Sequence, residues 1–164
     1  MKIRLDECLS FRVAAALRGF TANRSGFEVS HVRDDNPRKT DDPTWIRAFA
    51  ADGGDVVISG DPNILRHWPN LVAYRESGLI AFFPPARWDV LRGAGQAALI
   101  VRWWPAIVEK AKASQRGDCW RLPLIWSPDA NKFQQLKDPR FKTEADRKSH
   151  NILELPKRHE FRVQ

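Results

Sequence analysis

The stretch Asp55-Val56-Val57-Ile58-Ser59-Gly60-Asp61 decides the fold class of this 164-residue chain. Its β-branched centre is too short for a helix, and the turn residues that follow it are typical of the end of a buried strand. Directly upstream, an acid-proline pair precedes an apolar face formed by Trp45, Ile46, Phe49 and Ala50. That pattern predicts a helix with Asp42 as its N-cap and Pro43 at its first helical position.

Further upstream the same alternation of elements is found. Residues 2–6 and 27–32 alternate polar and apolar positions, which predicts two strands, and residues 33–41 predict a loop. Between the strands, apolar residues recur at helical spacing from Leu9 to Leu17. The order β-α-β-α-β predicts a parallel sheet with right-handed crossovers. We therefore expect the α/β fold class, as a single domain with a central parallel sheet flanked by helices.

Downstream, the pattern continues to residue 126 and then changes. Residues 79–83 predict a fourth strand, residues 96–114 a long helix kinked at Pro105, and residues 119–126 an edge strand. After that, charged and polar residues dominate and no period is sustained. We therefore predict a domain over residues 1–126 and a charged C-terminal extension over residues 127–164, which docks a partner or contacts RNA.

The composition excludes several classes of protein. With only two Cys the chain is no disulfide-rich secreted scaffold, and charges at Lys2 and Arg4 interrupt any apolar signal segment. No apolar run approaches the roughly 20 residues of a membrane-spanning helix. We expect a cytoplasmic protein with no membrane partner. The few Cys and His residues show no zinc spacing, and Gly93-Ala94-Gly95 follows no strand, which argues against a dinucleotide site.

The net charge of +7 arises downstream of Asp61. Residues 1–61 hold 10 Asp and Glu against 9 Lys and Arg, whereas residues 62–164 hold 10 against 18. Such a surface attracts polyanions such as nucleic acid, and we expect its Arg and Lys to contact phosphates. Six of the seven Trp lie between residues 68 and 126, and core packing, a partner interface and base stacking all remain open for them. We assign no individual RNA-binding residue.

Acidic residues recur where ligands bind in parallel α/β sheets, beyond the carboxyl ends of the strands. Asp6 follows the first strand, Asp42 opens the second helix, and Asp61 follows the third strand. Clustered carboxylates repel one another unless a cation neutralises them, and their hard oxygens suit Mg²⁺ or Mn²⁺. Helix capping by Asp42 and a turn at Asp61 are the structural alternatives, whereas Ser10 is better placed than Asp6 to cap the first helix.

These motifs, in their order and spacing, resemble the PIN-like domains, relatives of the VapC-type toxin ribonucleases. The segments that carry the resemblance are Asp6-Glu7-Cys8-Leu9-Ser10, Asp42-Pro43-Thr44-Trp45-Ile46 and Val56-Val57-Ile58-Ser59-Gly60-Asp61. The resemblance implies a metal-dependent endoribonuclease that hydrolyses RNA with Mg²⁺ or Mn²⁺. It makes Asp6, Asp42 and Asp61 both catalytic residues and metal ligands, with Glu7, Asp41 and Asp89 as candidate additional acids.

An alternative function is a non-catalytic module of the same fold that binds protein or RNA. An Arg or Lys side chain that fills the acidic cleft would favour that module, whereas bound Mn²⁺ beside Asp6 and Asp61 would favour the enzyme. The toxin role, an antitoxin partner and a homodimer are further hypotheses that the sequence leaves open.

Overall fold

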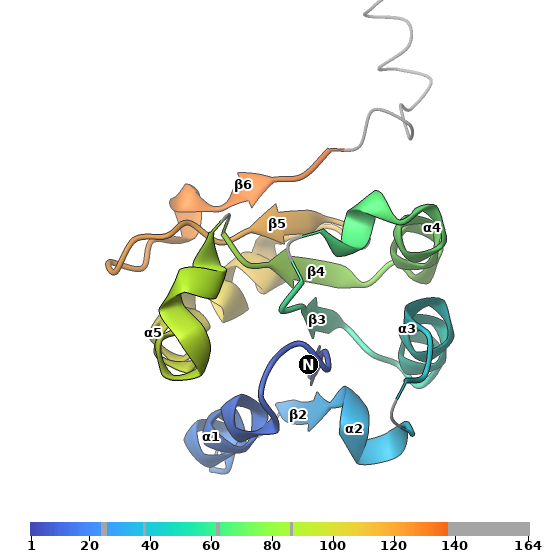
Figure 1. The fold of residues 1–164 in the computed structure, drawn as a ribbon, viewed down its shortest axis with the longest axis horizontal. Coiled ribbons are helices and arrows are strands. Elements are labelled where there is room, and N and C mark those ends of the chain that lie inside the picture. The colour runs from blue at the N-terminus through green and yellow to red at the C-terminus, as the bar shows by residue number, and fades with distance from the viewer. Residues whose placement is uncertain (24–25, 38, 62, 86, 138–164) are drawn as a thin grey trace, which may run out of the picture.

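A six-stranded sheet with the order β2-β1-β3-β4-β5-β6 forms the centre of the molecule (Figure 1). The computed structural model describes residues 1–137 apart from 24–25, 38, 62 and 86. The first five strands are parallel to their neighbours, and β6 is antiparallel to β5. The strands are β1 (Lys2–Leu5), β2 (Glu28–His31), β3 (Val56–Ile58), β4 (Ile80–Phe83), β5 (Cys119–Arg121) and β6 (Gln134–Gln135).

Helices cover both faces of this sheet (Figure 1). α1 (Phe11–Thr21) and α5 (Arg92–Ala113) pack on one face, and α3 (Asp42–Ala51) and α4 (Trp68–Ser77) pack on the other. Each face has its own apolar core because the β1, β3 and β4 side chains alternate between the two layers. The short elements are α2 (Val32–Asp35), η1 (Ile64–Arg66), η2 (Trp88–Leu91) and η3 (Ala130–Lys132).

The predicted α/β fold with a parallel central sheet is confirmed. Three elements differ from the sequence prediction. Part of the predicted loop over residues 33–41 is the short helix α2, which His31 caps by accepting the Arg33 N–H at 3.1 Å. Helix α4 was not predicted, since its buried residues Leu71, Ala73 and Tyr74 make too weak a helical pattern. β5 is not the edge of the sheet, because β6 pairs with it.

The first part of the predicted extension, residues 127–137, packs on the domain. Phe133 is only 7% exposed, and its ring meets the rings of Phe82 and Trp103 edge to face at centroid distances of 5.4 and 5.2 Å. The sequence showed Phe133 as an isolated apolar residue among polar ones, so its place in the core left no periodic signal. Residues 138–164, the remainder of the predicted extension, lie outside the described residues.

Within the part of the chain that the structure describes, no helix has the length and apolar character needed to cross a membrane.

Candidate acidic site

The order of the strands reverses between β1 and β3. From β1 the chain moves outward to β2, then crosses back over β1 to β3 and continues in the opposite direction. In doubly wound sheets this reversal of strand order marks the crevice where ligands bind, outside the carboxyl ends of the strands. Asp6 follows β1 and Asp61 lies just beyond β3, so two of the three predicted acids flank this point.

Asp6 is buried and accepts four hydrogen bonds. Its Oδ1 accepts the backbone N–H groups of Cys8 at 3.1 Å, Leu9 at 3.3 Å and Gly60 at 2.8 Å. Its Oδ2 accepts the hydroxyl of Ser59. Burial raises the pKa of Asp6 to about 6, the hydrogen bonds oppose that rise, and the charge of Asp42 adds to it. A carboxylate with four donors is held in one orientation.

Gly60 allows the two strand ends to approach this closely. A Cβ atom at Gly60 would lie 2.8 Å from the backbone carbon of Cys8 and 2.9 Å from its Cβ, which is closer than real contacts allow. The Gly60 carbonyl accepts the indole N–H of buried Trp88 at 3.1 Å, so η2 is fixed against the same turn. The glycine therefore brings β1, β3 and η2 together at the acidic edge.

Asp42 is free of the capping role that the sequence allowed for it. The N-cap of α3 is Asp41, whose carboxylate accepts the Thr44 N–H at 3.1 Å, so the predicted capping position is wrong by one residue. Asp42 is the first helical residue, and its oxygens accept the indole N–H of Trp45 at 3.0 Å and the amide of Asn70 at 2.8 Å. Asp41 is exposed on the outside of this cap.

Asp61 is partly exposed, and one of its oxygens has a partner. Oδ1 accepts the Asn63 N–H at 2.7 Å, which is the turn that the sequence allowed. The Asp61 backbone N–H donates to the Ser59 hydroxyl oxygen at 3.0 Å. Ser59 thus links the two acids, because its hydroxyl donates to Asp6 and accepts from the backbone of Asp61.

The three predicted acids converge electrostatically. The pKa of the Cys8 thiol is raised to about 12 by desolvation of its sulfur and then by the charges of Asp6, Asp61, Glu7 and Asp42. A thiol with so high a pKa is protonated near neutral pH, so Cys8 is no reactive thiolate. In the described part of the chain no Lys, Arg or His forms an ion pair with Asp6, Asp42 or Asp61.

Helix α4 adds two polar residues that the sequence analysis missed. Asn70 donates to Asp42, and Tyr74 lies one turn further along the helix with 1% of its surface exposed. Burial raises the pKa of Tyr74 well above its usual value, and the charges of Asp6, Asp42 and Asp61 add to the rise. The helix itself went unpredicted, so no sequence signal linked either residue to the acids.

Two other candidate acids stand apart. Glu7 is exposed and turns toward solvent, although its charge reaches Cys8. Asp89 is exposed in η2, and no described contact joins its carboxylate to the three acids. Among the described residues, the charges of Asp6, Asp42 and Asp61 act together on both Cys8 and Tyr74, whereas that of Glu7 acts on Cys8 alone.

The donor set fits a hydrated divalent cation. Among the described residues, no three Asp, Glu, His or Cys side chains are arranged as a ready-made metal cage. Mg²⁺, however, usually keeps several waters and binds proteins through one or two carboxylates. Asp42 and Asp61 retain free lone pairs on hard oxygens, and the buried Tyr74 hydroxyl, on which their charges act, has no hydrogen-bond partner among the described residues. Both features suit a hydrated ion.

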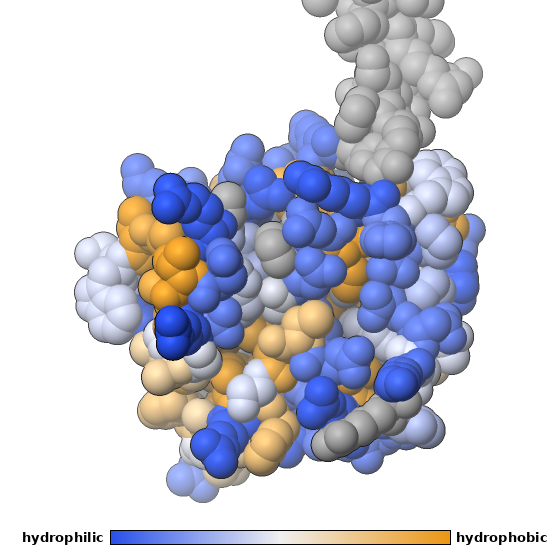
Figure 2. Space-filling model, viewed as in Figure 1, coloured by the Kyte–Doolittle hydropathy of each residue, from blue (hydrophilic) through white to orange (hydrophobic). Residues whose placement is uncertain are grey.

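Most of the downstream tryptophans belong to the core. Trp88, Trp103, Trp104 and Trp120 are buried, whereas Trp68 and Trp126 are 50% and 62% exposed. Apolar residues in Figure 2 gather mainly on the side of α1 and α5, and the side of α3 and α4 is mostly hydrophilic. Core packing thus accounts for four of the six, and base stacking stays open only for the two exposed rings.

The chain was compared with families of known proteins. A family model described as a PIN like domain matches residues 1–86, which span β1 to β4 and contain all three acids. Neither the curated proteins nor the solved structures contain a match to this chain.

Proposed function

The chain belongs to the PIN-like domain family, and from that premise we propose that it is an endoribonuclease that uses Mg²⁺ or Mn²⁺ to hydrolyse RNA. The observation that carries the proposal is the convergence of Asp6, Asp42 and Asp61 at one sheet edge, with no cation of the described chain paired to them. PIN-like domains are commonly nucleases. The family and the unpaired charges favour the same activity.

Each acid has a defined part in this proposal. Asp42 and Asp61 would hold the ion through oxygens that still have free lone pairs. Asp6, fixed by Ser59 and Gly60, sets the negative potential that attracts the ion and the spacing of the two strand ends. The bound ion supplies an activated water and neutralises charge that develops on the phosphodiester. The basic half of the chain binds the RNA backbone, so binding should weaken steeply with salt.

RNA cleavage by the purified protein tests the proposal. Single-stranded RNA is incubated with Mn²⁺, with Mn²⁺ plus chelator, and with the Asp6→Asn and Asp61→Asn proteins. We expect cleavage only by the wild-type protein with free Mn²⁺. Cleavage that survives chelator, or that both variants retain, would contradict the metal-dependent mechanism.

One observation favours the non-catalytic alternative. The four hydrogen bonds to Asp6 already explain that acid as a structural centre that joins β1 to β3. A binding module would bind RNA with no Mn²⁺ requirement and would cleave none. The same assay, run beside a filter-binding measurement, separates the two functions.

The toxin role is a further proposal built on the nuclease activity. It requires a protein partner, and the loop with exposed Leu124, Ile125 and Trp126 offers three adjacent apolar side chains for one. Induced expression of the wild-type protein should arrest growth, and expression of Asp61→Asn should not. Equal growth of both cultures would contradict the toxin role.

A further inference from the structure

Helix α4 contributes two polar side chains, Asn70 and Tyr74, on the helix face that contacts Asp42. Asn70 and Tyr74 are four residues apart, so both side chains lie on the same face of the helix. The Asn70 amide donates to Asp42 Oδ2 at 2.8 Å, which shows that this face is turned toward the acids. Helical side chains lean toward the N-terminus, so the Tyr74 ring extends toward the level of Asn70.

The Tyr74 hydroxyl is buried and has no hydrogen-bond partner among the residues that the structure describes. The ring packs edge to face on Phe83 with 5.7 Å between centroids, and the residue is 1% exposed. Its oxygen finds no donor or acceptor in the described structure. A buried hydroxyl without a partner destabilises a fold, and phenylalanine would fill the same space without that cost. The packing of the ring thus does not explain why this position has tyrosine in place of phenylalanine.

The surroundings of this hydroxyl are anionic. Burial keeps it protonated, and the charges of Asp6, Asp42, Cys119 and Asp61 add to that effect by raising its pKa further. A protonated hydroxyl next to carboxylates is a hydrogen-bond donor. An ordered buried water needs two to four polar partners, and the free lone pairs of Asp42 and Asp61 supply the acceptors that a water beside Tyr74 requires.

We propose that Tyr74 is a positioning residue whose hydroxyl binds a water molecule of the acidic site and thereby holds the hydration shell of a divalent cation. Asn70 supports it from the same face by fixing Asp42. The inference rests on the proposed function, because it takes the acids as the site of the cation. It adds α4 to a site that the sequence motifs build only from β1, α3 and β3.

Mn²⁺ binding and thermal unfolding of Tyr74→Phe test this inference. The substitution keeps the ring and its contact with Phe83 and removes only the hydroxyl. Free Mn²⁺ is counted by electron paramagnetic resonance, and unfolding is followed without divalent ions. Ser77→Ala is the matched control, since it removes a hydroxyl of the same helix that bonds the Tyr74 carbonyl and lies outside the acidic site. Asp61→Asn reports on the acids themselves.

We expect Tyr74→Phe to weaken Mn²⁺ binding by about tenfold, the usual effect of losing an outer-sphere partner of a metal. Without Mn²⁺ the variant should unfold at the wild-type temperature or higher, because an unpartnered hydroxyl has been removed. Ser77→Ala should bind Mn²⁺ as the wild type does.

Two results would overturn the inference and leave the proposed function standing. In the first, Asp61→Asn loses Mn²⁺ binding and Tyr74→Phe keeps it. In the second, Tyr74→Phe unfolds at a lower temperature without Mn²⁺ and binds the ion normally, which would make the hydroxyl a structural group. Wild-type protein that binds no Mn²⁺, or Asp61→Asn protein that binds it fully, would instead contradict the proposed function and with it this inference.

Discussion

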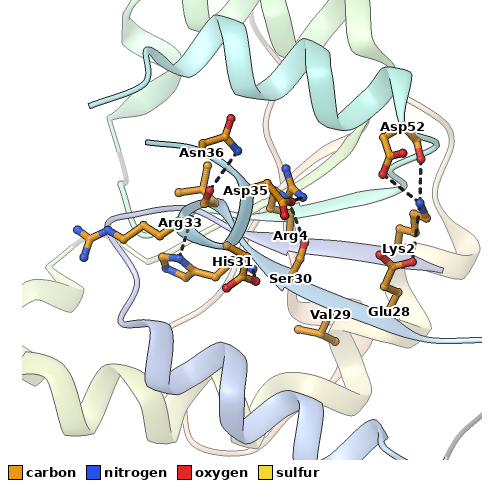
Figure 3. Close-up of polar contacts among 12 residues, drawn as sticks. Lys2, Arg4, Glu28, Val29, Ser30, His31, Arg33, Asp35, Asn36 and Asp52 are labelled. Atoms are coloured by element: carbon orange, nitrogen blue, oxygen red, sulfur yellow. Dashed lines mark hydrogen bonds and ion pairs between the residues drawn. The ribbon is translucent and has the colours of Figure 1, made fainter. Parts of the chain in front are cut away.

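Two polar regions of the described structure differ in how their carboxylates are paired: in one the carboxylates have cationic partners, and in the other they have none. In the region drawn in Figure 3, which we call the paired cluster (Lys2, Arg4, Glu28, Asp35 and Asp52), each acid faces a base. The buried Arg4 guanidinium binds Asp35, donates to Ser30 at 3.0 Å and lies 4.5 Å from the centre of the Phe49 ring. The charged side chains of the paired cluster thus have partners of opposite charge within the chain.

The acidic site has the opposite arrangement. Asp6, Asp42 and Asp61 accept hydrogen bonds from neutral donors and have no ion pair among the described residues. Gathering like charges in this way lowers the stability of a fold. The paired cluster is thus explained by the stability of the fold alone, whereas for the acidic site we propose a cation that arrives from outside.

The largest expected effect is on RNA cleavage. Asp61→Asn should lower the Mn²⁺-dependent cleavage rate by about a hundredfold or more, in line with losses of single charge-stabilising groups in active sites. Asp129→Asn is the matched control, because Asp129 accepts the N–H two residues ahead at 2.8 Å, as Asp61 does at 2.7 Å. Initial rates at saturating Mn²⁺ measure both. Equal losses of the cleavage rate in the two variants would show that losing a turn hydrogen bond of this kind, and not the position of Asp61 in the acidic site, lowers the rate.

The second effect is on the pH dependence of stability. The pKa of Asp6 is about 6 in the fold and 3.8 in its ordinary state, so the folded protein binds this proton more tightly. Protonation of Asp6 therefore stabilises the fold by about 3 kcal/mol at low pH. This contribution is fully present below about pH 4 and is lost as the pH rises through about 6. Asparagine does not titrate in this range, so the stability of Asp6→Asn lacks this contribution at every pH.

Urea unfolding at several pH values compares the two proteins. The stability of Asp6→Asn relative to wild type should therefore increase by about 3 kcal/mol between pH 4 and pH 7. Any constant offset from altered hydrogen bonds cancels in this comparison. Parallel stability curves across this range would show that burial and the neighbouring acids do not perturb Asp6.

The smallest effect concerns the paired cluster. Asp35→Asn should lower the free energy of unfolding by about 1–2 kcal/mol, because it leaves the buried Arg4 charge without its anion while Asp35 itself is largely exposed. Mn²⁺ binding should be unchanged. Chemical denaturation and Mn²⁺ titration of the same sample measure both quantities, and a loss of Mn²⁺ binding would show that the two regions are not independent.

The elements that could be predicted from the sequence are those with a local pattern of residues that is typical of a strand or a helix. The β-branched run at β3 and the apolar spacing of α1 placed the sheet and its crossovers, and the rule for strand ends then located Asp6 and Asp61. Ser10 caps α1 as expected, by accepting the Arg12 N–H at 3.3 Å.

What the sequence could not provide depends on contacts between distant segments. The choice between Asp41 and Asp42 as helix cap is made by backbone geometry, since either residue satisfies the motif. The charges of the acids act on Tyr74 because α4 packs beside α3, and Phe133 reaches the core because β6 pairs with β5. None of these contacts leaves a local pattern in the sequence.

The most direct test of the central claim is a crystal structure of the protein with Mn²⁺, with the ion located by its anomalous scattering. We expect a manganese peak at the edge formed by Asp6, Asp42 and Asp61, with the ion bound directly by one or two of these carboxylates and otherwise by water. The Tyr74 hydroxyl should bond one of those waters. An Arg or Lys side chain in that position, or manganese bound only elsewhere on the molecule, would contradict the central claim.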